Sequence, residues 1–251
     1  MRIIISPAKK MRSAEDPAPE GRPVFLDRTA KLLEILRAMS YEELKALWAC
    51  SDKIARENLL RIQQMNLMQN VSAALASYDG IQYQYMAPQV FPDDYYNYVQ
   101  EHLRILSGFY GILRPLDGVV PYRLEMQARL QTERGRDLYE FWGDSLYREL
   151  TRDSAVDSAV ILNLASQEYS KCIRKYLTPQ DRFITCIFGE QSGGKIIEKG
   201  VYVKMARGEM VRFLAGRSAK EPEAAKEFDG LGFAYHEELS TEERYVFLRN
   251  V

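Results

Sequence analysis

The sequence has few of the residues that form disulfide bonds or metal sites. Its 251 residues include three cysteines, Cys50, Cys172 and Cys186, and two histidines, His102 and His236. An odd number of widely spaced cysteines without a C-x-x-C pair argues against a disulfide framework and is typical of a reducing compartment. Two histidines are too few for a multi-histidine metal site, and a Ser-His-Asp triad would have to use one of them. The sequence therefore predicts no metal and no cofactor, and it identifies no catalytic residue.

Long apolar runs are also missing. No stretch approaches the roughly 18 apolar residues that a membrane-spanning helix needs. The apolar run Ile3–Ile5 is too short for the core of a signal peptide. We therefore expect a cytoplasmic protein that does not enter the membrane.

An excess of charge of one sign is absent from the total but present locally. The 34 basic and 35 acidic residues give a net charge of −1, which excludes a uniformly basic nucleic-acid coat protein. Residues 1–12 nevertheless carry four bases and no acid, and residues 171–217 carry ten bases against four acids. Residues 218–251 have four bases and eight acids. Such segregation permits a basic cleft on a neutral protein.

Local patterns predict an α+β chain that forms a single domain over residues 1–251, with a central mixed sheet surrounded by helices. Strands are predicted at 2–5, 81–85, 160–164, 183–188 and 201–203, and a hairpin turn at 192–195. Helices are predicted from Asp27, from the capping box Ser40–Glu43, after Ser51, from Pro92 to Gly108, and at 167–177 and 205–216. The tyrosines between positions 78 and 98 fit the border of the core better than a base-stacking platform.

A glycine-bracketed turn at Ser107–Pro115 allows two interpretations. If a helix ends at Gly108 and another begins after Gly111, the turn is a helix-hairpin-helix-like element, in which backbone N–H groups approach a DNA phosphate. A plain glycine at the end of a helix explains the same residues equally well. A second candidate for the element is Ser51–Gln63. Lys9, which follows the first predicted strand and a proline turn, is placed where a side chain can enter a cleft, but its position alone favours a solvated loop lysine.

Six blocks distributed along the chain resemble the YaaA family, the bacterial peroxide stress proteins. They are Ile4–Lys9, Leu106–Asp117, Pro121–Met126, Asp137–Asp144, Asn163–Tyr169 and Lys204–Met210. The resemblance implies an α+β domain that binds duplex DNA in a basic cleft and acts in survival of hydrogen peroxide. It also implies an association with limiting unincorporated iron and the oxidative damage that iron causes. One departure is Lys10, where members of the family often carry threonine.

We therefore expect double-stranded DNA as the partner, bound mainly through its phosphates with weak sequence specificity. The candidate DNA-binding residues are Lys9, Lys10, Gly108, Gly111, Arg114, Arg123, Lys204 and Arg207. An alternative is an enzyme that acts on a phosphorylated or nucleotide-like substrate in the same cleft, with Lys9, Glu125, Asp144, Ser166 and Arg207. A third hypothesis is direct iron binding by His236, Glu237 and Glu238 or by Asp137, Glu140 and Asp144.

Overall fold

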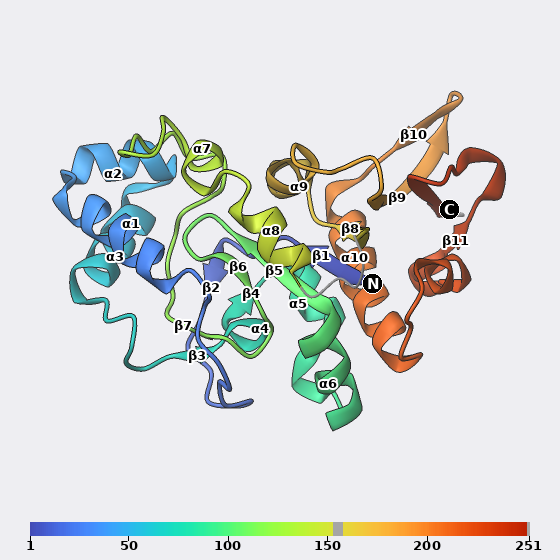
Figure 1. Ribbon diagram of the computed structural model, residues 1–251, viewed down its shortest axis with the longest axis horizontal. Coiled ribbons are helices and arrows are strands. Elements are labelled where there is room, and N and C mark those ends of the chain that lie inside the picture. The colour runs from blue at the N-terminus through green and yellow to red at the C-terminus, as the bar shows by residue number, and fades with distance from the viewer. Residues whose placement is uncertain (153–157, 250–251) are drawn as a thin grey trace.

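A mixed sheet forms the centre of the computed structural model, which describes residues 1–152 and 158–249 (Figure 1). Its strands, in spatial order, are β11 (Phe233–Tyr235), β12 (Arg244–Arg249), β9 (Arg182–Ser192), β8 (Val160–Leu164), β1 (Arg2–Ile5), β5 (Leu103–Ser107) and β6 (Gly111–Leu113), and β10 (Lys195–Ile197) pairs with β9. The five strands from β12 to β5 run parallel, whereas β11, β6 and β10 are antiparallel to their neighbours. The α+β class with a central mixed sheet is confirmed.

Strand β1 lies in the middle of this sheet and is buried because it has partners on both sides. Ile4 is paired with Arg104 of β5 on one side and with Asn163 of β8 on the other. Ile3, Ile4 and Ile5 have no exposed surface. A strand buried on both faces needs a continuous apolar run, and the three isoleucines supply it.

Helices cover both faces of the sheet. The α-helices are α1 (Leu26–Ala38), α2 (Tyr41–Trp48), α3 (Asp52–Gln64), α4 (Ala74–Ser77), α5 (Ile81–Met86), α6 (Asp93–His102), α7 (Leu138–Trp142), α8 (Ser145–Thr151), α9 (Gln167–Arg174) and α10 (Gly200–Gly216). Consecutive strand residues point to opposite faces. Thr185 accepts a hydrogen bond from Arg174 of α9, whereas Cys186 lies beside Arg207 of α10. Helices α9 and α10 therefore lie on opposite faces of the sheet.

Helices α1, α2 and α3 form a group at one end of the molecule (Figure 1). The predicted capping box is present at the start of α2: Ser40 accepts a hydrogen bond from the Glu43 N–H, and Glu43 accepts one from the Ser40 N–H. Two short strand pairs, β2 (Lys10–Met11) with β4 (Tyr78–Asp79) and β3 (Ser72–Ala73) with β7 (Gly118–Val119), form separate two-stranded sheets. Within the two described ranges, every helix is too short or too polar to cross a membrane.

Three predicted elements are wrong. Residues 81–85 form helix α5 instead of a strand, and residues 201–203 belong to α10. The helix that begins at Asp93 ends at His102 instead of Gly108, because Leu103–Ser107 leaves it to pair with β1. In each case tertiary packing overrides a local pattern of a few residues.

The contact between α5 and α10 depends on a glycine. A Cβ atom at Gly208 would overlap the carbonyl oxygen of Gln82 and approach the backbone nitrogen of Met86. The backbones of the two helices therefore touch directly, and no larger residue fits between them without displacing one of them.

We expect Gly208→Ala to lower the free energy of unfolding by about 1–3 kcal/mol, because the added methyl group overpacks this contact. Gly200→Ala is the matched control on the same helix, since a Cβ there meets no atom within 4 Å. The control should change stability by less than about 1 kcal/mol. Urea unfolding of the three proteins measures both effects, and equal stabilities of the two variants would contradict the close approach.

Candidate functional site

Three serines meet at the carboxyl ends of the parallel strands. Ser107 ends β5, while Ser6 and Ser166 follow β1 and β8. The Ser6 Oγ accepts a hydrogen bond of 2.8 Å from the Ser166 N–H, and the two Oγ atoms lie 3.2 Å apart. The chain leaves β1 toward β5 on one side, and β8 lies on the other side. Because ligands of open α/β sheets bind outside the carboxyl ends of strands where the order reverses, this point is the candidate site.

Charged side chains cover these strand ends. Lys9 follows β1 by four residues, and its Nζ lies 3.4 Å from the Glu125 Oε1. The same oxygen lies 3.0 Å from the Arg123 Nη2. Glu125 and Arg123 are largely buried, whereas the side chain of Lys9 is 65% exposed. The arrangement anchors one solvent-facing cation at the site, backed by a buried arginine.

A second carboxylate, Glu168, lies in the first turn of α9. Its Oε1 accepts a hydrogen bond of 3.3 Å from the Gln127 N–H. Burial raises the pKa of Glu168, the charge of Glu125 raises it further, and Lys9 and the backbone donor oppose the shift. A carboxyl group with a raised pKa beside a cation is suited to proton transfer.

A network of buried tyrosine side chains contacts the carboxyl ends of β1 and β5. The Tyr78 and Tyr122 hydroxyls lie 2.9 Å apart, and Tyr122 lies 2.6 Å from the Ser107 Oγ. The Tyr83 hydroxyl donates to the Ser6 carbonyl oxygen at 3.0 Å. Burial raises the pKa of Tyr122 to about 12, so its hydroxyl stays protonated. Tyr78, Tyr83 and Tyr122 are therefore part of the core and hold the strand ends in register.

The helix-hairpin-helix prediction at Ser107–Arg114 is wrong. This segment is a β-hairpin, with Leu106 paired to Ile112 and Ser107 paired to Gly111. Gly108 is buried, and a Cβ there would lie 2.5 Å from the Leu124 carbonyl oxygen. Gly111 has a φ of +78° and packs against Trp142. Both glycines serve close packing inside the protein, and Gly108 lets the loop carrying Arg123 and Glu125 lie directly on the strand ends.

The second position considered for that element, Ser51–Gln63, forms a single helix. Ser51 precedes α3, which continues without a break to Gln64. The turn in this region lies earlier, at Ala49–Ser51, between α2 and α3.

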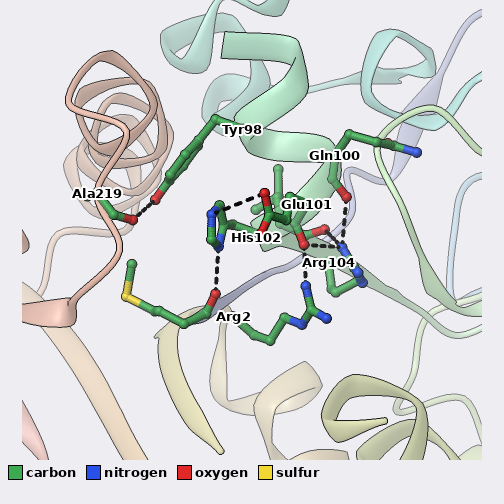
Figure 2. A network of polar contacts seen from close by, with 9 residues as sticks. Arg2, Tyr98, Gln100, Glu101, His102, Arg104 and Ala219 are labelled. Carbon is green, nitrogen blue, oxygen red and sulfur yellow. Dashed lines mark hydrogen bonds and ion pairs between the residues drawn. The ribbon is translucent and has the colours of Figure 1, made fainter. Parts of the chain in front are cut away.

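The charge of residues 1–12 is divided between two edges of the sheet. Arg2 begins β1, and its guanidinium donates to the Glu101 carbonyl at the end of α6. Figure 2 shows Arg104 directed at the same helix end, where it donates to the Gln100 and Glu101 carbonyls. Cations at a helix C-terminus satisfy its last carbonyls and its dipole. His102 completes this network, since its Nδ1 lies 2.9 Å from the Met1 carbonyl oxygen.

Arg114 also lies at the amino edge. It follows β6, which is antiparallel to β5, so it emerges beside Arg104 and away from Lys9. Its N–H donates to the Asp117 Oδ2 at 2.8 Å. Asp117 is 5% exposed, and burial raises its pKa to about 6 although the Arg114 N–H and the charges of Arg114 and Arg104 lower it. Arg114 is therefore not part of the site at the carboxyl edge.

The remaining candidate cations lie in three different settings. Lys10 is close to Lys9 along the chain, and its side chain, 76% exposed, forms an ion pair of 2.5 Å with Asp79. Lys204 is exposed on α10. Arg207 is half-buried on α10 beside Cys186, and burial lowers its pKa. The structure thus brings Lys9, Lys10 and Arg123 to one region and separates them from Arg114.

The groups considered for iron do not converge. Among residues 1–152 and 158–249, no three His, Cys, Asp or Glu side chains are placed to share a metal ion. Asp137 caps α7 by accepting from the Glu140 N–H. Glu140 and Asp144 form ion pairs with Arg136 and Arg148. These carboxylates have local structural roles.

Sequence reasoning missed several residues around the site. Glu168 and Ser6 lie within family-like blocks, but position alone gave them no role. Arg129 and Trp48 belong to no block, and they line a cavity with Lys9 and Glu125. The sheet topology could have indicated Ser6 and Glu168, because the carboxyl ends of parallel strands share one edge of the sheet.

Comparison with known proteins gives a consistent result over the whole chain. The sequence profile of the family described as "Peroxide stress protein YaaA" matches residues 1–239. A UPF0246 protein of Desulfitobacterium hafniense is 56% identical over 250 residues, which cover 99% of this chain and 98% of that protein. UPF0246 proteins of Agathobacter rectalis and Pediococcus pentosaceus are 50% and 47% identical over 252 and 251 residues. These two alignments cover all of this chain and 100% and 98% of the relatives.

The buried carboxyl of Asp117 predicts a specific pH dependence. The group binds its proton more tightly in the folded chain, with a pKa of about 6, than in the unfolded chain, where the value is about 3.9. Its contribution to stability is therefore lost as the pH rises through this window. Asp117→Asn keeps an acceptor for the Arg114 N–H and cannot ionise.

The stability of Asp117→Asn relative to the unaltered protein should thus increase by about 2 kcal/mol between pH 4.5 and pH 7. Urea unfolding at both pH values measures the difference. Asp229→Asn, at an exposed position, supplies the baseline for a charge change alone. A difference that does not vary with pH would argue against the raised pKa.

Proposed function

We propose that this chain, which belongs to the family of the peroxide stress protein YaaA, binds duplex DNA through phosphate contacts at the carboxyl edge of the sheet. The observation that carries the proposal is the position of Lys9. Its ammonium group is anchored at the point where the strand order reverses, yet most of its side chain faces solvent. A fixed, accessible cation at such a point is suited to holding an anionic ligand.

Neighbouring cations support the same proposal. Lys10 and Arg129 are exposed, and Arg123 lies behind Lys9. Contacts of this kind read phosphate and not base sequence, so the binding is weakly sequence-specific and sensitive to salt. We assign the implied link with iron-dependent damage to this DNA contact, because no three His, Cys, Asp or Glu side chains in the described part of the chain are placed to share a metal ion.

We expect the affinity of the pure protein for duplex DNA to fall steeply between about 50 and 200 mM salt. Lys9→Glu should weaken binding about tenfold at the lower salt and reduce the slope of log K against log salt by about 1. Lys220→Glu is the control with the same change of charge. Lys220 is exposed and lies away from the carboxyl edge, because the carbonyl of its neighbour Ala219 accepts a hydrogen bond from Tyr98 near the amino edge. Fluorescence anisotropy with a labelled duplex measures all three proteins.

Absence of binding, or binding that does not depend on salt, would count against the proposal. Equal losses in the two charge-reversal variants would show that net charge, and not the site, attracts the duplex.

A second candidate function is an enzyme that acts on a phosphorylated or nucleotide-like substrate at the same edge. The observation in its favour is the pair of carboxylates, Glu125 and Glu168, which phosphate binding does not require. Glu168, whose pKa is raised by burial, is placed to act as an acid or base beside Lys9. Asp144 and Arg207, which were expected to join this group, have other surroundings.

Glu168→Gln separates the two functions. Glutamine keeps an acceptor for the Gln127 N–H but cannot transfer a proton. If the protein is an enzyme, the variant should bind duplex DNA as before and lose protection of cells against hydrogen peroxide by about tenfold or more in survival, since loss of one acid–base group costs about 10²–10⁴-fold in rate. Full protection by the variant would remove proton transfer by Glu168 from consideration.

A further inference from the structure

One side of helix α9 carries three cations that face solvent. Lys171, Arg174 and Lys175 are exposed, and residues at positions i, i+3 and i+4 lie on the same side of a helix. The other side of α9 packs on the protein through Cys172 and Ile173, which are buried. The three cations therefore form a basic surface, which we call the α9 face.

An aromatic ring lies beside each of these cations. The distances from cation to ring centroid are 4.5 Å for Lys171 over Tyr139, 5.2 Å for Arg174 over Phe183 and 5.5 Å for Lys175 over Tyr176. Arg174 also donates a hydrogen bond to the Thr185 Oγ1. A ring attracts a cation and holds it in place, but unlike a carboxylate it leaves the net charge of the pair positive.

The α9 face also lacks the carboxylates that pair with cations on other helices. In the described part of the chain, none of its three cations forms an ion pair. On α3, by contrast, Arg56 and Arg61 each pair with a carboxylate one turn away. The carboxylate of Asp181, which follows α9, is engaged by the N–H and the hydroxyl of Thr178. The positive charge of the α9 face is therefore available to an external anion.

The α9 face continues from the candidate site. Helix α9 begins directly after Ser166, and Glu168 in its first turn interacts electrostatically with Lys9. Lys171 lies about one turn further along, and Lys175 lies about 10 Å from Glu168 along the helix axis. The cations of the site and of the α9 face thus follow one another from the carboxyl edge along one face of the sheet (Figure 1).

We propose that the α9 face binds phosphates of the same DNA duplex that Lys9 holds at the carboxyl edge. One DNA strand advances about 3.4 Å per nucleotide, so the length of α9 after Glu168 spans about three nucleotides. A duplex is long and stiff enough to contact the carboxyl edge and this face together, which a free phosphate is not. The inference rests on the proposed function and adds a second surface that the duplex contacts.

The triple variant Lys171→Gln, Arg174→Gln, Lys175→Gln tests this surface by fluorescence anisotropy with a labelled duplex. The affinity should fall about a hundredfold at about 50 mM salt, and the slope of log K against log salt should fall by about 3, because each phosphate contact contributes about 0.9 to that slope.

The matched control is Lys31→Gln, Lys220→Gln, Lys226→Gln, which removes the same charge at exposed positions. Lys31 belongs to α1, while Lys220 and Lys226 follow α10, which lies on the opposite face of the sheet. The control should change the affinity less than about threefold, because salt screens charges that do not contact the duplex.

A charge-retaining variant separates phosphate contact from packing. Lys171→Arg, Arg174→Lys, Lys175→Arg should bind the duplex within about threefold of the unaltered protein, since phosphate contacts depend on charge. Urea unfolding checks that each variant is folded. If the glutamine triple variant does not fold, Lys171→Gln, Lys175→Gln keeps the hydrogen bond of Arg174 to Thr185 and should lower the slope by about 2.

The inference is overturned if the glutamine variant binds the duplex as tightly as the control variant, or if the charge-retaining variant loses as much affinity as the glutamine variant. Vesicles that contain phosphatidylserine are the second probe. Binding to vesicles that depends on the α9 face, without binding to the duplex, would assign the face to a membrane and also overturn the inference. Failure of the proposed function has a different signature, because Lys9→Glu would then leave duplex binding unchanged while the glutamine variant still weakens it.

Discussion

The parallel pairing of β1 with both β5 and β8 is the constraint on which the rest of the structure depends. It directs three strand ends to one edge, so Ser6, Ser107 and Ser166 meet there and three strand beginnings meet at the other. A strand of four residues is about 13 Å long, and this length separates Arg2 from Lys9. The first cation therefore caps α6 (Figure 2), and the second reaches the candidate site. A basic segment in the sequence becomes two sites with unrelated roles.

Close backbone contacts then fix what covers the strand ends. Gly108 lets the Leu124–Glu125 backbone lie directly on the β5–β6 turn, and Gly208 does the same for α5 against α10. The first contact holds Glu125 between Arg123 and Lys9. A buried arginine without a carboxylate partner would be strongly destabilising, so Glu125 stabilises the fold by pairing with Arg123.

Much of this arrangement follows from sequence, and the errors have identifiable causes. The Ile3–Ile5 run, the Ser40–Glu43 capping box and the 192–195 turn each carry a local signal, and each is present as predicted. Residues 81–85 alternate as a strand would, but they lie against Gly208 of α10, and the resulting helix packing decides their conformation. Leu103–Ser107 continues a helical pattern, yet it is needed as the partner of β1. Contacts between segments about 100 residues apart leave no local trace.

The candidate site was even less predictable from the sequence than the fold. Sequence similarity marked blocks of the chain, but it could not separate residues at the strand ends from residues that pack in the core. Gly108, Gly111 and Asp144 have structural roles here, whereas Lys9 and Arg123 stay at the site. Trp48 and Arg129 join them only because α2 and the chain after Glu125 enclose one cavity. The cavity thus has two accessible cations, Lys9 and Arg129, beside a buried carboxylate, Glu125, that is already paired with Lys9 and Arg123.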